Sequence, residues 1–334
     1  MGAVHSMTMN NQKNIEYAEI LRLIGQAERV LLCTHLAPDG DALGSMLALG
    51  SLVKRMGKQV TMICHDPVPG YLVFLPGQQA IKLPAQAAQE HFDLAISVDA
   101  SGAERLGDSH ALFAKCPVTI QMDHHQTNTR FAQHNLVLAQ LPASGSVVFP
   151  LFEAAGLPIT REEAIYLYTA ISTDTGNFCF GHISDVTFEQ VAATMRAGLP
   201  LVETARQLHL MREKEQVLML GRALNSLKFF MDGRLSGMEI TQQDYLDCGA
   251  TDEHTDKIVN HGLYIPGVQM CYLANETQDG IKFSLRSIAP YRVSDIAFRL
   301  GGGGHNQAAG CTIHKPLAEA VQIVRQAMES ELSS

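Results

Sequence analysis

The 334-residue chain has no tryptophan, no C-x-x-C pair among its seven cysteines, and fewer basic than acidic residues. Its 25 Lys and Arg against 34 Asp and Glu give a formal net charge of -9, so the overall field does not attract long nucleic acid. The cysteines are scattered along the sequence and odd in number, which indicates reduced thiols. No run reaches the ~18 consecutive apolar residues of a membrane helix, and the polar amino end argues against a signal peptide. We expect a soluble, cytoplasmic protein.

The first 200 residues alternate between short apolar runs and segments with helical spacing. With 46% hydrophobic residues, the chain can bury the cores of one large or two ordinary domains. Strands are expected at 30–33, 59–63, 94–98 and 118–122, and helices at 15–26, 43–56, 147–155, 162–172 and 187–196. This alternation predicts an α/β fold: a mostly parallel sheet with helices on both faces.

The pattern changes after about residue 210, where a charged segment leads into a second region. Asp232-Gly233 between two apolar runs predicts a hairpin. Strands at 268–274 and 281–287, with helices at 293–300 and 317–328, predict a smaller α+β domain with a mixed sheet. We expect domains at 15–200 and 216–330, joined by a helical linker at 201–215.

Acidic and histidine residues follow the expected strands at the point where each ends. The set is His35, Asp39, Asp41, Asp99, Asp123, His124 and His125, with Asp174 at the end of an apolar helix. Ligands bind at the carboxyl ends of strands in open α/β sheets. Each group alone is also compatible with a turn or a helix cap, Asp41 as a cap among them. Residues 143–146 are interpreted as a helix cap rather than a nucleophile, because no base accompanies Ser144.

Several carboxylates and imidazoles in one pocket cannot all be buried and charged without counter-ions. Divalent metals would supply that compensation. A mixed oxygen and imidazole set without thiolate favours Mn²⁺ or a similar ion over structural zinc. Two ions bridged by one carboxylate could activate a water for in-line attack on phosphorus.

In this order, four clusters resemble the DHH family of phosphoesterases: residues 35–41, Asp99, Asp123-His124-His125 and Asp174. The family is named after the motif that stands here as Asp123-His124-His125. Phe283-Ser284-Leu285-Arg286-Ser287 and the glycine-rich residues 301–310 are similar to the DHH-associated domain. The resemblance covers nearly the whole chain. It is strongest with the NrnA-like branch, which comprises bifunctional oligoribonucleases and phosphoadenosine phosphatases.

The resemblance implies two divalent ions, with Mn²⁺ preferred and Mg²⁺ or Co²⁺ as alternatives. The implied ligands of the first ion are His35, Asp39 and Asp99. Those of the second are Asp41, Asp99, His124 and Asp174, which makes Asp99 the bridge. By the same resemblance His125 lies against the scissile phosphate, and Asp123 orients the histidine pair. The implied catalytic residues are therefore His125, Asp123 and Asp99.

The second domain carries the candidate substrate-binding residues. Glycines without Cβ let backbone N–H groups approach an anion, and an arginine can grip phosphate with two hydrogen bonds. The resemblance implies that the substrate contacts Ser284, Arg286, Gly302, Gly303, Gly304, His305 and Asn306. A flexible glycine loop and a solvated strand face are the alternative interpretations.

We expect a metal-dependent phosphodiesterase and phosphatase of the 3′–5′ exoribonuclease type. It would hydrolyse short oligoribonucleotides and dinucleotides to mononucleotides, and remove the 3′-phosphate of phosphoadenosine phosphate. The alternatives are a cyclic or linear dinucleotide phosphodiesterase, an exopolyphosphatase or pyrophosphatase, a single-strand DNA exonuclease, and a nucleotide-binding regulatory module without turnover. The DNA exonuclease is disfavoured because no basic, aromatic-interleaved patch is present. Neither a membrane nor long duplex nucleic acid is expected as a partner, and a homodimer is among the open oligomeric states.

Overall fold

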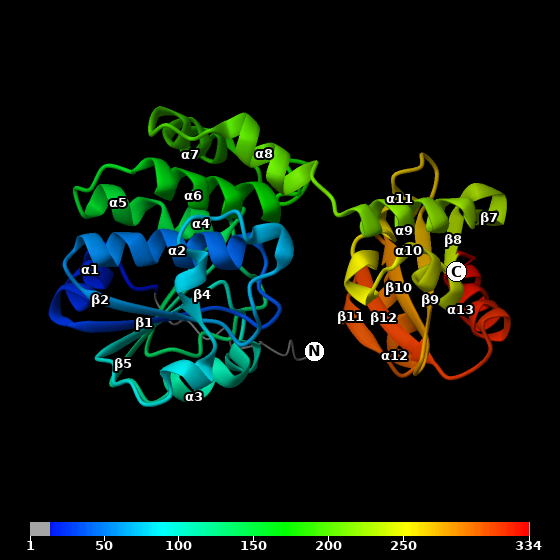
Figure 1. Cartoon of the computed structure of the whole chain (residues 1–334), viewed down its shortest axis with the longest axis horizontal. Coiled ribbons are helices and arrows are strands. Elements are labelled where there is room, and N and C mark those ends of the chain that lie inside the picture. Colours follow the sequence, from blue (N-terminus) through cyan, green and yellow to red (C-terminus); the bar gives the residue numbers. More distant parts are fainter. Residues whose placement is uncertain (1–13, 334) are drawn as a thin grey trace, which may run out of the picture. The chain divides into compact units, whose positions relative to one another are not determined.

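The computed structural model describes residues 14–333 and separates into two compact units, with the division between Met211 and Arg212 (Figure 1). Each unit has its own sheet and its own hydrophobic cores. Within residues 14–333, no helix is both long and apolar enough to span a membrane.

The first unit is built on a six-stranded sheet in which every neighbouring pair is parallel. In spatial order the strands are β3 (Ile81–Lys82), β2 (Gln59–Ile63), β1 (Arg29–Cys33), β4 (Leu94–Val98), β5 (Val118–Asp123) and β6 (His134–Val137). The four strands expected from the sequence form the centre. The edge strands β3 and β6 were missed, because such short strands carry too few residues for a periodic pattern.

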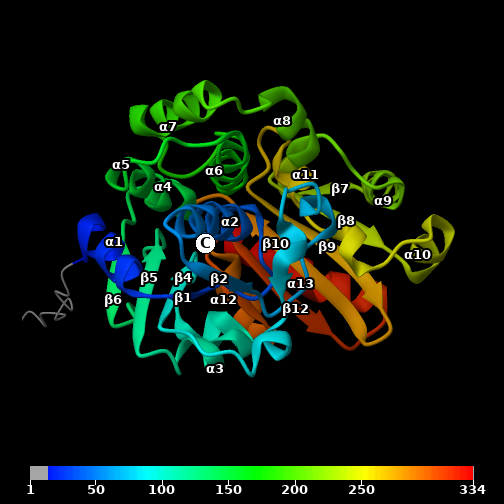
Figure 2. The ribbon, with the colours of Figure 1, turned by 60° about the vertical axis from the view of Figure 1, so that its left-hand side comes forward.

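Helices cover both faces of this sheet, as the sequence predicted (Figures 1 and 2). They are α1 (Tyr17–Gln26), α2 (Gly40–Arg55), α3 (His110–Phe113), α4 (Ser144–Val148), α5 (Pro150–Ala154), α6 (Arg161–Asp174), α7 (Asp185–Arg196) and α8 (Leu201–His209). The single helix expected at 147–155 is wrong. It is divided into α4 and α5 at Pro150, which has no N–H to continue the first helix.

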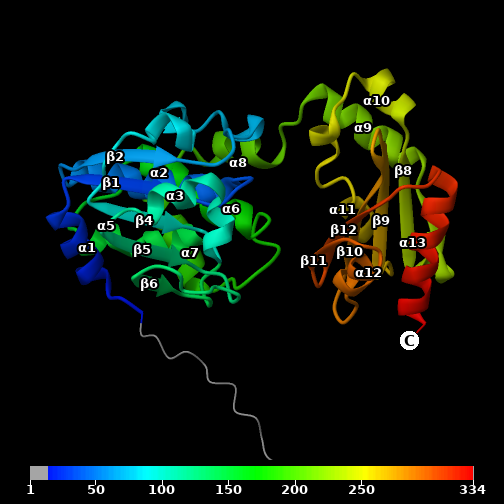
Figure 3. The ribbon, with the colours of Figure 1, turned by 90° about the horizontal axis from the view of Figure 1, so that it is seen from below.

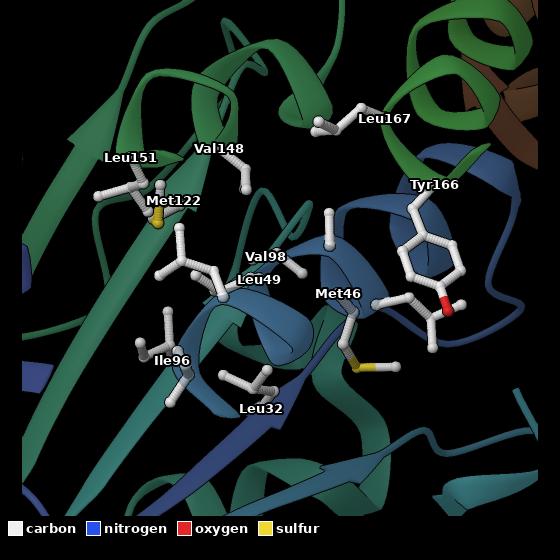
Figure 4. Close-up of a cluster of buried hydrophobic side chains, with 14 of the residues drawn as sticks. Leu32, Met46, Leu49, Ile96, Val98, Met122, Val148, Leu151, Tyr166 and Leu167 are labelled. Carbon is white, nitrogen blue, oxygen red and sulfur yellow. The ribbon is translucent and has the colours of Figure 1, made fainter. Parts of the chain in front are cut away.

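Successive residues of the central strands enter two different cores. On β1, Leu32 packs with Met46 and Leu49 of α2, whereas Leu31 lies in a second core on the other face of the sheet with Phe113 of α3. Figure 4 shows the first core, where Leu32 and side chains of β4 and β5 meet those of α2, α4, α5 and α6. With both faces buried, the strand ends are held in fixed positions.

Helices α2 and α6 pack unusually closely because glycines line their contact. A Cβ on Gly44 would lie 2.5 Å from the backbone oxygen of Tyr166, and one on Gly40 would lie 2.5 Å from the Thr173 side chain. The first turn of α2 therefore lies against the last turn of α6. This contact places Asp41 beside Asp174, although 132 residues lie between them in the sequence.

The second unit contains a six-stranded mixed sheet. In spatial order its strands are β11 (Gly303–His305), β12 (Ala308–Ile313), β10 (Gly280–Ser287), β9 (Met270–Thr277), β8 (Leu235–Ile240) and β7 (Lys228–Phe230). Only β8 and β9 pair in parallel. The hairpin expected at Asp232-Gly233 is confirmed as the antiparallel β7–β8 pair.

The helices of the second unit lie on both sides of its sheet. They are α9 (Lys214–Asn225), α10 (Gln242–Cys248), α11 (Asn260–Leu263), α12 (Val293–Arg299) and α13 (Leu317–Leu332). One core packs α12 and α13 against the sheet, and another packs α9, α10 and α11 (Figure 3).

The glycine-rich segment is a strand, so its interpretation as a flexible loop is wrong. Gly303–His305 form β11, which pairs with β12. A Cβ on Gly302 would collide with the carbonyl oxygen of Gly310, and one on Gly304 would lie 2.6 Å from that of Ala308. At least these two glycines are therefore required by the close approach of β12.

The α2–α6 contact gives a stability prediction. We expect Gly44→Ala to lower the free energy of unfolding of the first unit by about 1–3 kcal/mol, because the new methyl group meets backbone that cannot move without separating the helices. Gly25→Ala is the matched control, since a Cβ there would have no heavy atom within 4 Å. It should be neutral or slightly stabilising, because alanine favours helix. Urea unfolding followed by circular dichroism measures both, and equal stabilities would contradict the prediction.

Candidate active site

The first group of site residues gathers where β1 and β4 end. These strands are neighbours in the sheet, so their carboxyl ends lie side by side. The Nε2 atom of His35 lies 3.4 Å from Asp99 Oδ2 and 3.9 Å from Asp39 Oδ1. Asp39, not Asp41, caps α2, because its side chain accepts hydrogen bonds from the backbone N–H groups of Asp41 and Ala42. The interpretation of Asp41 as a cap is wrong.

A second group forms on the other side of Asp99. The Nε2 atom of His124 lies 3.4 Å from Asp174 Oδ2, 3.7 Å from Asp41 Oδ2 and 3.7 Å from Asp99 Oδ1. Asp99 thus presents Oδ2 to His35 and Oδ1 to His124. Three overlapping trios at this site bring their ligand atoms close enough together to hold a metal ion: His35, Asp39 and Asp99; Asp41, His124 and Asp174; and Asp99, His124 and His125.

Backbone contacts orient the two histidines. His35 Nδ1 lies 2.8 Å from the carbonyl oxygen of Leu36, and His124 Nδ1 lies 3.3 Å from that of Leu141. In the neutral form of each histidine, with Nδ1 donating to its carbonyl, Nε2 has a lone pair directed at the carboxylates that can bind a cation. His124 Nε2 is buried and has no hydrogen-bond partner among the described residues. Such an orphaned atom fits a metal ligand.

Asp99 has an uncommon backbone conformation for a non-glycine residue, with φ at 57°. Its N–H donates to Met122 O at 3.1 Å, and the Ser144 hydroxyl donates to Asp99 Oδ1 at 2.9 Å. Burial raises the pKa of this carboxyl, but the hydrogen bond and charge of His35, with the charge of His124, outweigh it and lower the pKa to about 2. Asp99 is therefore an ionised carboxylate, held rigidly between the two groups.

The pKa values of Asp41 and Asp174 are shifted in the opposite direction, upward. Burial, followed by the charges of Asp99 and Asp174, raises the pKa of Asp41 well above its usual range. Burial likewise raises the pKa of Asp174 to about 6. Asp41 accepts hydrogen bonds from the N–H groups of Ser144 at 2.6 Å and Gly145 at 2.9 Å, which offset only part of this cost. A cation bound here would remove the repulsion, and the carboxylate and imidazole donors fit Mn²⁺ or Mg²⁺.

His125 lies at the more open side of the site. Its Nδ1 atom is 2.8 Å from Asp123 Oδ1, and this hydrogen bond raises the pKa of His125 to about 9. Asn128 donates from Nδ2 to Asp123 Oδ2 and so fixes the buried carboxylate. The His125 side chain is 42% exposed, so a charged imidazole that can donate to an incoming anion stands at the entrance.

The sequence-predicted substrate residues lie in the second unit. Ser284 and Arg286 lie on one face of β10 and line a cavity of about 260 Å³, whose lining also includes Asn275, Lys282 and the acidic Asp252, Glu253 and Asp256. Gly302, Gly303, Gly304, His305 and Asn306 lie in or beside β11. The structure thus brings together His35, Asp39, Asp41, Asp99, Asp123, His124, His125 and Asp174 in the first unit, and places the substrate set in the second.

Sequence reasoning missed the supporting residues of α4. The helix cap expected at residues 143–146 falls at Ala143, and the Ser144 hydroxyl donates to Asp99. Asn128 was also missed. The run of small residues at 143–146 was the available signal, since small side chains leave backbone N–H groups open to a buried carboxylate.

An α/β unit that gathers carboxylates and imidazoles, without thiolate, at its strand ends is typical of hydrolases that use divalent metal ions to cleave phosphoester bonds. Residues 29–171 match the DHH family, N-terminal domain, and residues 242–334 match the DHHA1 domain. The chain belongs to the DHH family of phosphoesterases, and is a metal-dependent hydrolase of phosphoester bonds.

Known relatives cover nearly all of the chain. The bifunctional oligoribonuclease and PAP phosphatase NrnA of Thermus thermophilus is 30% identical over 97% of this chain and 98% of its own length. The enzyme of the same name from Bacillus subtilis is 22% identical, over 89% and 93%. A solved exopolyphosphatase-related protein from Bacteroides fragilis has a TM-score of 0.88 at 23% identity, covering 94% of this chain and 95% of its own, and so shares the fold.

Asp174 gives a pH prediction for the metal-free protein. A carboxyl whose native pKa is raised from 3.8 to about 6 stabilises the fold below pH 3.8, and this contribution is lost as the pH rises through 6. We expect Asp174→Asn to stabilise the metal-free protein at pH 7.5 by ~1 kcal/mol or more, and to change little at pH 4. Thermal unfolding across this range measures the effect.

The control is Asp185→Asn, which removes an exposed carboxylate at the start of α7. It should not stabilise the protein, because a negative charge is favourable at a helix amino end. A metal-free Asp174→Asn protein that is less stable than wild type at pH 7.5 would contradict the charge repulsion described above.

Proposed function

We propose that this phosphoesterase acts on short nucleotides, releasing mononucleotides from oligoribonucleotides of a few residues and the 3′-phosphate from phosphoadenosine phosphate. The observation that carries the chemistry is the position of Asp99, which offers one oxygen to His35 and the other to His124. The substrate class is supported by the names of the Thermus and Bacillus relatives. The net charge of -9 also favours small substrates over long nucleic acid.

Two divalent ions would be held by the two groups that share Asp99. The first would take His35, Asp39 and Asp99 as ligands, and the second Asp41, Asp99, His124 and Asp174. Ions of this kind supply Lewis acidity and lower the pKa of water. Mn²⁺ is the preferred ion in this proposal, with Mg²⁺ and Co²⁺ as alternatives. A solved RecJ exonuclease bound to manganese, with a TM-score of 0.53 at 15% identity, shares the fold.

The chain's own residues prepare the site for a phosphate group. With its pKa at about 9, His125 is protonated at neutral pH and can donate a hydrogen bond to a phosphate oxygen, where negative charge develops in the transition state. Asp123 keeps His125 charged and fixes its ring, and Asn128 holds Asp123. Ser144 keeps the Asp99 carboxylate oriented.

The second unit would bind the rest of the substrate. Arg286 is suited to a bidentate grip on phosphate, with Ser284 beside it on β10. β11 is an edge strand of its sheet, so N–H groups on its outer side can bind an anion. In this proposal the substrate contacts Gly302, Gly303, Gly304, His305 and Asn306. In this proposal residues 15–200 carry the metal site, 201–215 form the linker, and 216–330 bind substrate. All seven cysteines are free thiols, in keeping with the proposed cytoplasmic location.

A turnover assay with Mn²⁺ tests the substrate class. It compares a two- to five-nucleotide RNA, phosphoadenosine phosphate, a cyclic dinucleotide and pyrophosphate side by side. Release of mononucleotides from the first and of phosphate from the second is the expected result. Preference for the cyclic dinucleotide or pyrophosphate would overturn the proposed substrate class, and nucleotide binding without turnover of any compound would overturn the enzymatic role.

Replacing Asp99 tests the bridging role. We expect Asp99→Asn to lose turnover of the RNA while keeping the far-ultraviolet circular dichroism of wild type, since the amide has the same shape but no charge to share between two cations. Asp93→Asn is the control, because Asp93 lies just before the opposite end of β4 and accepts hydrogen bonds from the N–H groups of Glu28 and Arg29. This variant should remain active. Near-normal turnover by a folded Asp99→Asn protein would exclude the bridge.

A further inference from the structure

The chain makes a tight turn directly after Asp174, the last residue of α6. Gly176, Asn177 and Phe178 have φ values of 54°, 57° and 65°, which is rare for consecutive residues of which two are not glycine. Thr175 is buried and fixes the turn. Its hydroxyl accepts from Phe178 N at 3.0 Å and donates to Ile171 O at 2.7 Å, and its carbonyl accepts from the N–H groups of Cys179 and Phe180 at 2.9 Å each.

This turn brings the Phe180 ring back over Gly176. A Cβ on Gly176 would lie 2.5 Å from Phe180 Cδ2, so only glycine leaves room for the ring. The Cα atoms of Gly176 and Asp174 are at most ~7.6 Å apart, because consecutive Cα atoms are ~3.8 Å apart. The ring therefore lies over a residue two positions along the chain from a carboxylate assigned to the metal site.

The two aromatic side chains of the turn have different surroundings. Phe178 packs between Tyr168 and Phe188, with ring centroids 6.5 Å and 5.5 Å away. Phe180 is 61% exposed. Phe178 thus anchors the turn, while an aromatic face of Phe180 is left open to solvent.

A second contact ties this segment to the opposite side of the site. The Nε2 atoms of Gln126 and His182 lie 3.3 Å apart in a side-chain hydrogen bond. Gln126 directly follows His125, and His182 comes two residues after Phe180. The segment that carries Phe180 is therefore joined to Asp174 by the chain and to Gln126, the residue after His125, by a hydrogen bond.

We propose that Phe180 is the surface on which the nucleobase next to the reacting phosphate stacks. This inference rests on the proposed function and deepens it. Base stacking on an aromatic ring is tolerant of sequence, because every base has a π-face. It suits an enzyme that degrades short RNA and has a negative net charge, which does not attract its anionic substrate.

Kinetics of Phe180 variants test the proposal. For an RNA dinucleotide, Phe180→Ala should raise KM about 5- to 150-fold, the factor that corresponds to the loss of one stacked base. The KM for a dinucleotide that lacks both bases should not change. Phe180→Leu should behave like Phe180→Ala despite its apolar bulk, and Phe180→Tyr should restore the wild-type KM. Phe298→Ala, at a ring 78% exposed on α12, is the control and should be silent.

Fluorescence gives a readout that does not depend on turnover. The chain has no tryptophan, so Phe180→Trp introduces a single indole beside the site. In the presence of Mn²⁺, AMP should quench its emission, whereas ribose 5-phosphate should not. Equal responses to the two compounds, or none, would overturn the stacking role.

The outcomes separate this inference from the proposed function. If wild type releases no mononucleotides from short RNA, the proposed function fails. If wild type does so but Phe180→Ala leaves the KM for the dinucleotide unchanged, the stacking inference alone fails. A Phe180→Ala protein with a changed sedimentation coefficient and an unchanged KM would also overturn it, because Phe180 would then contact another protein surface rather than a base.

Discussion

The repulsion among buried carboxylates at one edge of the first sheet is the constraint on which the rest of the structure depends. Asp41 and Asp99 are almost completely inaccessible, and Asp174 stands close enough to raise the pKa of Asp41. His35, His124 and His125, with a few hydrogen-bond donors, oppose this charge within the first unit's site. Burial of this kind is costly unless cations complete the site. The fold therefore has an electrostatic cost that a bound cation would relieve.

A scaffold that holds like charges together must resist their separation. β1 and β4 do so because their two faces are packed into separate cores, the first of which is drawn in Figure 4. The α2–α6 contact does so because Gly40 and Gly44 let the helix backbones approach. The amino end of α4 adds N–H donors to Asp41 and a hydroxyl to Asp99. Each of these contacts holds a carboxylate in a position that charge repulsion disfavours.

The central strands and the grouping of the candidate site residues could be predicted because chemistry and periodicity coincide at the strand ends. β2 and β4 have the bounds expected from their apolar runs, and Asp99 and His124 follow β4 and β5 directly. The edge strands β3 and β11 could not be predicted, since one has two residues and the other is mostly glycine. The role of Ser144 was also hidden, because it depends on a contact with Asp99 that is 45 residues away in sequence. The turn that contains Phe180 depends on left-handed φ values at Asn177 and Phe178, which no pattern in the sequence predicts.

The shared use of Asp99 by two cations is the central claim, and a crystal structure with Mn²⁺ tests it most directly. Anomalous scattering at the manganese absorption edge would locate each ion. The account predicts two ions, one beside His35 and one beside His124, with different oxygens of Asp99 bound to each. A single ion, or two ions of which only one contacts Asp99, would contradict it.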